Sequence, residues 1–305
     1  MSVYGYVYNH HDYGTREVTD EELKKIQTCL VHMLAEIMEV CDKYDIKPFI
    51  MYGCEIGMIR HDHAFIHWDD DLDLGMIRED YDKFATIMDK ELSDRYVISA
   101  PLKGHKAWYR FIQLGRKGTK RIGVMTKDRS MKIPTNHVYI DVFPLDNVPE
   151  DPEERAKKQK KVNLLEGISG AVLFAKNPPR ELFDDFKKVP GGEKELKQRM
   201  IGGRLPSFRS VSSWMHAVDR AVRYNGDSDH LVSAMCGGYY NEPYFLKEEI
   251  LPLHRNKFCG VDVYEVNDPD RYLRHIYSDY MQLPPVSERR NHHAAELEID
   301  EELLK

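Results

Sequence analysis

Apolar residues recur at helical spacing over a long segment near the start of the chain. From Leu23 to Tyr44 an apolar side chain follows every three or four positions, which predicts an amphipathic helix that packs on a core. Thr19 and Glu22 stand at the spacing of a capping box, in which each side chain caps a backbone amide of the other. The helix is therefore expected to begin directly after Thr19.

Shorter patterns predict the remaining elements of this first part. Short apolar runs and alternating apolar and polar positions are typical of strands, and spacing of three to four is typical of helices. Strands are expected at 49–52, 66–76, 108–114, 138–143 (stopped by Pro144) and 258–266, helices at 55–61, 78–92 and 270–280, and a short frayed helix over the tail 296–305.

The pattern becomes almost entirely helical in the middle of the chain. Residues 151–235 show few strand signals, so we interpret them as a helical insertion into a core formed by 1–150 and 236–295. A run of lysines at 157–161 has two interpretations: a solvated helix face, or a surface that holds an anionic lipid-linked substrate. Residues 1–17 are expected to form an irregular arm.

Composition narrows the class of protein. The chain has 305 residues, 42% of them apolar and 31% charged, which is typical of a globular protein. Its net charge of -7 argues against binding nucleic acid through bulk electrostatics. Five dispersed cysteines without a CxxC pair predict reduced thiols, and neither a secretory signal nor a membrane span is expected. A cytoplasmic location is the resulting expectation.

Candidate chemistry is concentrated in the segment WDDDLDLG, residues 68–75. Residues two apart in a strand share a face and lie about 6.6 Å apart, so Asp71 and Asp73 are expected to point the same way. Leu72 and Leu74 would then point into a core. Two adjacent carboxylates repel each other, and a divalent cation between them relieves that cost. Mg²⁺ that bridges carboxylates to a substrate phosphate is the usual arrangement.

Two other interpretations of this segment remain open. A calcium loop would use Asp69, Asp71 and Asp73 as its first ligands, but Leu74 stands where that loop has glycine, and Asp80 where it has glutamate. A solvated acidic turn without function does not explain the apolar residues that precede the charges. We favour a metal-dependent phosphoryl-transfer site.

Two further residues support that interpretation. Gly53 lies between a predicted strand and a predicted helix, where backbone amides can approach a phosphate. Asp141 lies on another predicted strand and supplies a third carboxylate. A glycine turn, a DxD strand and a third acidic strand follow one another in the nucleotidyltransferase fold of polymerase-β-like enzymes. We therefore predict an α+β protein, a small mixed sheet flanked by helices with a helical insertion.

The sequence also resembles a known family. The stretch YGCEIGMIRHDHAFIHWDDDLDLGMIREDYDKF, residues 52–84, is similar to the signature of the LicD/fukutin family, and so are the blocks at 139–146 and 272–293. His67 stands where the family usually has proline, the pair Cys54-Glu55 replaces small or hydroxyl residues, and Ser278 replaces glycine. None of these departures affects the DxD motif.

The resemblance implies a reaction and its participants. It implies that a phosphorylated alcohol, most often phosphocholine, moves from a CDP-activated donor to a glycan hydroxyl of a lipopolysaccharide, teichoic acid or capsule precursor, releasing CMP. Ribitol phosphate and glycerol phosphate are the other groups expected. A nucleotidyltransferase that releases pyrophosphate is the alternative enzyme, and an inactive nucleotide- or glycan-binding module is the alternative of another class.

Roles for individual residues follow from the motifs and from the resemblance. Mg²⁺ (or Mn²⁺) is expected to be held by Asp71, Asp73 and Asp141, the three catalytic candidates; Asp141 could instead accept the proton of the attacking hydroxyl. Donor binding is assigned to Gly53, Cys54, Arg60 and Asp70, with Arg60 as a phosphate clamp. Possible substrate contacts are His61, Arg289 and His292.

Overall fold

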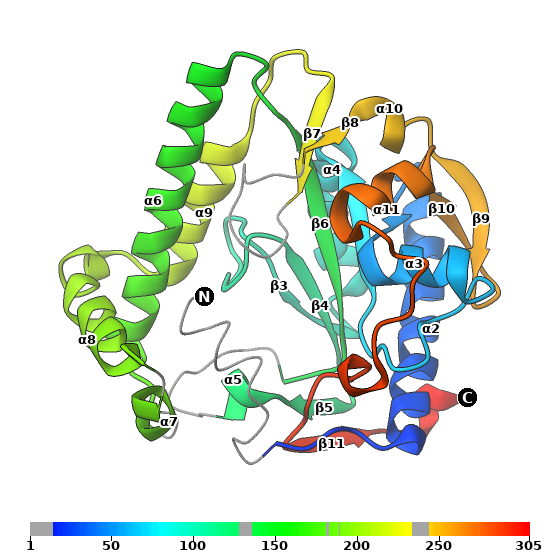
Figure 1. Ribbon diagram of the computed structural model, residues 1–305, viewed down its shortest axis with the longest axis horizontal. Coiled ribbons are helices and arrows are strands. Elements are labelled where there is room, and N and C mark those ends of the chain that lie inside the picture. The colour runs from blue at the N-terminus through cyan, green and yellow to red at the C-terminus, as the bar shows by residue number, and fades with distance from the viewer. Residues whose placement is uncertain (1–14, 128–135, 181–182, 189, 234–243) are drawn as a thin grey trace.

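The computed structural model describes residues 15–127, 136–180, 183–188, 190–233 and 244–305 (Figure 1). Its main sheet is mixed and has the strand order β3-β4-β6-β2-β1-β10-β9, with β7 paired to β6 and β8 to β7. The strands are β1 Phe49–Ile50, β2 Asp73–Ile77, β3 Tyr96–Ser99, β4 Ile112–Arg116, β6 Tyr139–Asn147, β7 His230–Ser233, β8 Phe245–Leu246, β9 His254–Phe258 and β10 Val261–Glu265. A second sheet pairs β5 Thr119–Ile122 with β11 Glu296–Ile299.

Helices cover both faces of the main sheet, which confirms the predicted α+β class. On one face, Leu74 and Ile140 pack in a core with α2 (Asp20–Lys43) and α4 (Arg78–Leu92). On the other, Phe143 and Leu145 pack in a second core with α9 (Val211–Val222) and α11 (Pro269–Tyr277). Side chains alternate between the two faces of a strand, so the odd-numbered residues of β2 and β6 share the face toward α9 and α11.

The predicted helices form where their caps and periodicity place them. The capping box of Thr19 and Glu22 is present at the start of α2, and ten buried residues follow along one face of this helix. α4 has the predicted bounds, and α3 (Tyr52–Arg60) begins three residues earlier than expected. In the part of the chain that the structure describes, no helix is long and apolar enough to cross a membrane.

Two strand predictions are corrected by the structure. β2 begins only at Asp73, and 66–72 is irregular. Pro144 does not end β6, which continues to Asn147. On one side of β6, the antiparallel partner strand changes at Pro144. β4 pairs with β6 only as far as Val142, and β7 pairs with β6 only from Leu145. The missing N–H of proline is tolerated at such a gap in the ladder.

The tail prediction is wrong. Residues Glu296–Ile299 form strand β11 against β5, and only Glu301–Leu304 is helical, as one 3₁₀ turn. The sequence ELEI alternates polar and apolar residues with the period of a strand, and this signal is too short to be decisive without its partner strand.

Helices α6 (Pro152–Lys176), α7 (Phe183–Lys188), α8 (Gly192–Gly202) and α9 form a helical unit, residues 152–222, that lies beside the sheet (Figure 1). The expected boundary at 235 falls too late, because β7 already belongs to the main sheet.

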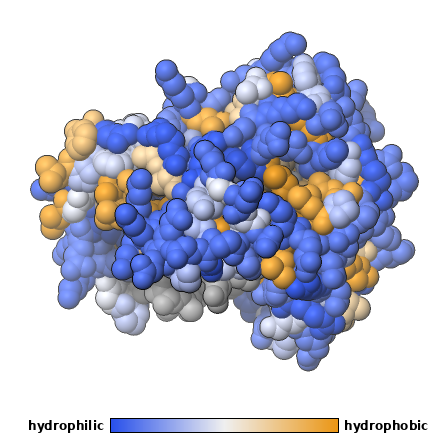
Figure 2. Space-filling model, turned by 90° about the horizontal axis from the view of Figure 1, so that it is seen from above, coloured by the Kyte–Doolittle hydropathy of each residue, from blue (hydrophilic) through white to orange (hydrophobic). Residues whose placement is uncertain are grey.

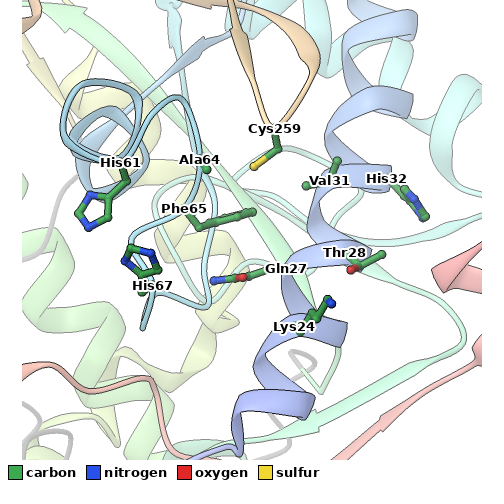
Figure 3. Close-up of a pocket in the computed structure, with 10 residues that line it drawn as sticks. All are labelled: Lys24, Gln27, Thr28, Val31, His32, His61, Ala64, Phe65, His67 and Cys259. Atoms are coloured by element: carbon green, nitrogen blue, oxygen red, sulfur yellow. The ribbon is translucent and has the colours of Figure 1, made fainter.

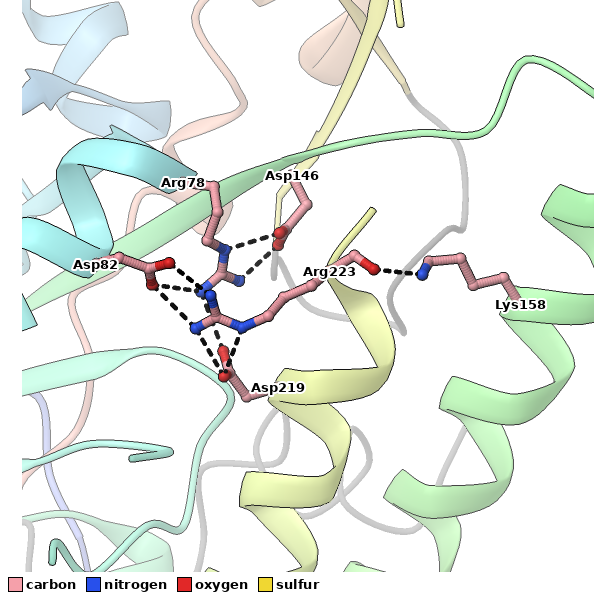
Figure 4. A network of polar contacts seen from close by, with 6 residues as sticks. All are labelled: Arg78, Asp82, Asp146, Lys158, Asp219 and Arg223. Atoms are coloured by element: carbon pink, nitrogen blue, oxygen red, sulfur yellow. Dashed lines mark hydrogen bonds and ion pairs between the residues drawn. The ribbon is translucent and has the colours of Figure 1, made fainter. Parts of the chain in front are cut away.

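Buried ion pairs fasten this unit to the core (Figure 4). Arg78 of α4 donates to both oxygens of Asp146, each at 2.7 Å, and to Asp219 of α9 at 3.0 Å. Arg223, directly after α9, contacts Asp82 and Asp219. Asp146 is therefore held in a buried ion pair with Arg78.

Candidate active site

Two aspartates lie side by side at the start of the parallel pair β2–β6. Asp73 is the register partner of Asp141, and the amide of Asp141 donates to the carbonyl of Leu72 at 3.2 Å. Both residues lie on the face toward α9 and α11, opposite Leu72 and Leu74. The sheet thus brings together carboxylates that are 68 positions apart in the sequence.

The segment before β2 continues this alternation although it is not a strand. Asp69, Asp71 and Asp73 are partly exposed, whereas Asp70 and Leu72 are buried. One side of the segment therefore carries three carboxylates, and Asp69 was not among the predicted magnesium ligands.

The carboxylates oppose one another's ionisation. Burial raises the pKa of Asp69 well above its usual value, and the neighbouring Asp71 raises it further. Burial also raises the pKa of Asp73, with added repulsion from Asp71 and Asp141. For Asp141, burial raises the pKa to about 8, although Gln113, which donates to Asp141 Oδ1 at 2.8 Å, favours the charged form.

This arrangement fits an open magnesium site. Among the described residues, no group of three or more His, Cys, Asp or Glu side chains is placed to hold a metal ion. Mg²⁺ is usually held by one or two carboxylates together with water and substrate phosphate, so a closed cluster is not required. Mg²⁺ binds hard oxygen ligands, and its charge would offset the repulsion between these carboxylates. The metal assignment of Asp71, Asp73 and Asp141 remains a prediction.

A pH-dependent stability difference is expected in metal-free protein. Asp141 retains its proton to about pH 8 when folded but loses it near pH 4 when unfolded, so the unfolded state binds fewer protons in this window. The contribution of Asp141 to stability therefore falls as pH rises from about 4 to 8. In thermal melts in EDTA, the melting temperature of Asp141→Asn relative to that of the wild type should rise as pH increases over this range. Saturating Mg²⁺ should reduce this rise. A difference in melting temperature that is independent of pH would contradict the raised pKa.

Gly53 lies in the first turn of α3, and its role in phosphate binding stays a prediction. A Cβ at this position would lie 2.8 Å from Asp69 Oδ2, so the absence of a side chain makes room for that carboxylate. The left-handed residue of the turn is Tyr52, at φ 54°, and its amide donates to the Tyr272 hydroxyl. The Cys54 thiol is buried and lies 3.6 Å from the Asp71 carbonyl, so only the backbone of Cys54 is suited to bind a donor.

Asp70 is a buried structural residue, which does not support its assignment to donor binding. It is 1% exposed and pairs with Arg121 at 2.5 Å and with His292 Nδ1 at 2.6 Å. Burial opposes its ionisation, but the His292 hydrogen bond and the Arg121 charge outweigh this and lower its pKa. Through Asp70, the carboxylate segment holds His292, whose Nδ1 lies 3.8 Å from Asp71 Oδ2.

Asp70→Asn is expected to destabilise the protein by about 3 kcal/mol, because it leaves Arg121 buried without its counter-charge. Urea unfolding at neutral pH measures the loss. Asp62→Asn is a matched control, since Asp62 is exposed and its left-handed backbone is one that asparagine adopts readily. Equal stability of the two variants would show that the buried cluster contributes little.

Arg60 contacts the C-terminal segment of the chain through one of its guanidinium nitrogens. One guanidinium nitrogen donates to the carbonyls of Tyr280 and Gln282. This contact weakens its assignment as a phosphate clamp. Arg289 donates to the Pro284 carbonyl at 2.9 Å and stacks over the Trp68 ring at 5.3 Å, which places it beside the start of the carboxylate segment.

His61 lies in a pocket of about 390 Å³ on the α2 side of this segment (Figure 3). Its ring faces His67, with centroids 5.1 Å apart. Gln27, which also lines the pocket, donates to the Asp69 carbonyl at 2.8 Å. The pocket thus adjoins the backbone of the carboxylate segment, and the substrate role of His61 stays a prediction.

Two site residues escaped the sequence analysis. Gln113 was inside a predicted strand, but its contact with Asp141 depends on the β4–β6 register. Tyr277 lies close enough to Asp73, Asp69 and Asp71 that their charges add to burial in raising its pKa. Its presence in the block at 272–293 was the available signal.

Comparisons with known proteins find sequences similar to this chain. Residues 45–162 match the family model described as LicD/FKTN/FKRP, nucleotidyltransferase domain, and this range contains Asp71, Asp73 and Asp141. The lipopolysaccharide cholinephosphotransferase LicD of Haemophilus influenzae is 25% identical over 284 residues, covering 91% of this chain and 98% of the relative. The uncharacterised protein RP689 of Rickettsia prowazekii is 27% identical over 147 residues, 46% of this chain and 52% of that protein. Over residues 45–162 the chain is thus similar to the LicD/FKTN/FKRP nucleotidyltransferase domain, and over most of its length it is similar to the LicD protein of Haemophilus influenzae.

Proposed function

We propose that the protein is a transferase that moves a phosphorylated alcohol from a CDP-activated donor to a glycan hydroxyl and releases CMP. Phosphocholine is the first choice for the group and a lipopolysaccharide precursor for the acceptor, because the relative that aligns with 91% of this chain is named for that activity. The observation that carries the proposal is the pairing of Asp73 with Asp141 beside Asp71. The reaction would take place in the cytoplasm.

The residues suggest how the step would proceed. Asp71 and Asp73 would hold Mg²⁺, which when bound offsets negative charge on the donor diphosphate and on the departing CMP. The acceptor oxygen forms a bond to the phosphorus, the phosphorus–oxygen bond to CMP breaks, and the hydroxyl proton passes to a carboxylate. Asp141 could take that proton once its carboxyl is ionised, and a cation held beside it would favour the ionised form.

A comparison of donors tests the proposal. The protein, with Mg²⁺ and candidate acceptors, is incubated separately with CDP-choline, CDP-ribitol and CDP-glycerol, and CMP is measured. We expect one CDP-alcohol to release CMP in step with labelling of the acceptor. Release of pyrophosphate from a nucleoside triphosphate, with no use of any CDP-alcohol, would instead establish the nucleotidyltransferase alternative. Failure to bind either class of nucleotide would favour an inactive module.

A further inference from the structure

The helical unit exposes apolar side chains to an unusual degree. Of the eight large apolar residues that are exposed in the described part of the chain, half belong to this unit. Their exposed fractions are 86% for Leu205, 79% for Phe208 and 64% each for Leu164 and Ile201. Large contiguous apolar surfaces on a folded protein usually mark a binding surface.

These side chains lie on α6, at the end of α8 and in the 3₁₀ turn that follows α8. Gly203 packs on α6, and a Cβ there would lie 2.0 Å from the Ala171 carbonyl oxygen. Leu164 lies two turns, about 10 Å, before Ala171 on the same stripe of α6. Leu205 and Phe208 follow Gly203 in a short 3₁₀ helix, Leu205–Phe208. The helical unit forms the left side of Figure 1, and the left end of Figure 2 carries apolar patches among polar ones.

The helical unit is also positively charged in an acidic protein. Residues 152–222 contain 15 Lys and Arg against 9 Asp and Glu, a net charge of +6, so the rest of the chain carries -13. Lys160 and Lys161 are exposed one turn before Leu164, and Arg204 is exposed next to Leu205. Basic side chains that surround exposed apolar ones are typical of surfaces that lie on anionic membranes.

We propose that this surface, formed by Leu164, Ile201, Leu205 and Phe208 with Lys160, Lys161 and Arg204, docks the protein on a bilayer that contains anionic lipids. The apolar side chains would enter the boundary between headgroups and acyl chains, and the basic ones would contact the lipid phosphates. A second copy of the chain is a poorer occupant, because two such surfaces would bring like charges together. The proposal does not depend on the reaction the protein catalyses.

Cosedimentation of the full chain with vesicles tests the docking. Vesicles of phosphatidylcholine are compared with vesicles containing 40 mol% phosphatidylglycerol, at low and at high salt. We expect binding only to the anionic vesicles, weakened at high salt as the charges are screened. The double variants Leu205→Ser with Phe208→Ser, and Lys160→Glu with Lys161→Glu, should each bind about tenfold more weakly.

Matched control variants distinguish binding through this surface from nonspecific binding to vesicles. Val286→Ser removes another exposed apolar residue, and Lys90→Glu with Lys257→Glu reverses two other exposed charges; both are expected to bind like the wild type. Circular dichroism checks that every variant is folded. Equal binding to neutral vesicles, no binding to anionic ones, or equal losses in the controls would overturn the proposal. So would a dimer, seen by light scattering, that dissociates in the Leu205 and Phe208 variant while vesicle binding is absent.

Discussion

Asp73→Asn is expected to lower turnover by about a thousandfold or more while the fold is retained. Asp73 begins β2 next to Asp141, and its carboxylate is repelled by Asp71 and Asp141, so it gains from a cation. Loss of one charged ligand removes stabilisation of the developing charge on the donor, a change worth several kcal/mol in such sites. CMP release from the preferred CDP-alcohol, at saturating Mg²⁺, is the measurement, and Asp71→Asn should behave in the same way.

Thermal stability distinguishes this loss from unfolding. In EDTA, Asp73→Asn should melt at the wild-type temperature or about 2–4 °C above it, because it relieves repulsion among neighbouring carboxylates. Mg²⁺ should raise the melting temperature of the wild type more than that of the variant. Asp62→Asn, in the exposed loop before the segment, should keep full activity. Undiminished turnover by Asp73→Asn, or by the wild type in excess EDTA, would rule out the two-carboxylate metal site.

The periodicity of the sequence was sufficient to predict the elements that are determined by residues within their own segment. α2 and α4 appear with the predicted periodicity because a continuous apolar stripe and, for α2, a capping box act within the segment itself. The carboxylate face could also be predicted, since the alternation of Asp71, Leu72, Asp73 and Leu74 follows from strand geometry. The proximity of Asp73 and Asp141 could be predicted because it requires only that two strands of the expected fold are neighbours.

Long-range partners explain what the sequence could not show. Asp70 was assigned to donor binding, but its side chain lies on the buried side, where Arg121 and His292 neutralise it. Arg60 was assigned to phosphate on the basis of residue type, whereas its acceptors are carbonyls of Tyr280 and Gln282, about 220 positions away. Such contacts depend on chain segments that meet only in the folded protein, so spacing within one motif does not reveal them.

Asp141→Asn is expected to lower turnover by about 10²–10⁴-fold if Asp141 accepts the proton of the attacking hydroxyl. The dependence on Mg²⁺ then separates its two possible roles. A proton acceptor leaves the Mg²⁺ concentration for half-maximal activity unchanged, whereas a lost metal ligand raises it. A variant that retains more than a tenth of wild-type turnover would remove Asp141 from both roles.

A substitution of Gln113 tests the role of the Asp141 carboxylate in a second, independent way. Its Nε2 donates to Asp141 Oδ1 and favours the ionised form, so Gln113→Leu should raise the pKa of Asp141 above its wild-type value. If Asp141 must be ionised to accept the proton, the acidic limb of the pH profile of kcat/KM moves to higher pH in this variant, while activity at high pH is largely kept. A purely structural role for Gln113 predicts a loss of activity that is equal at every pH. The direction of the shift therefore tests both the contact and the chemistry assigned to Asp141.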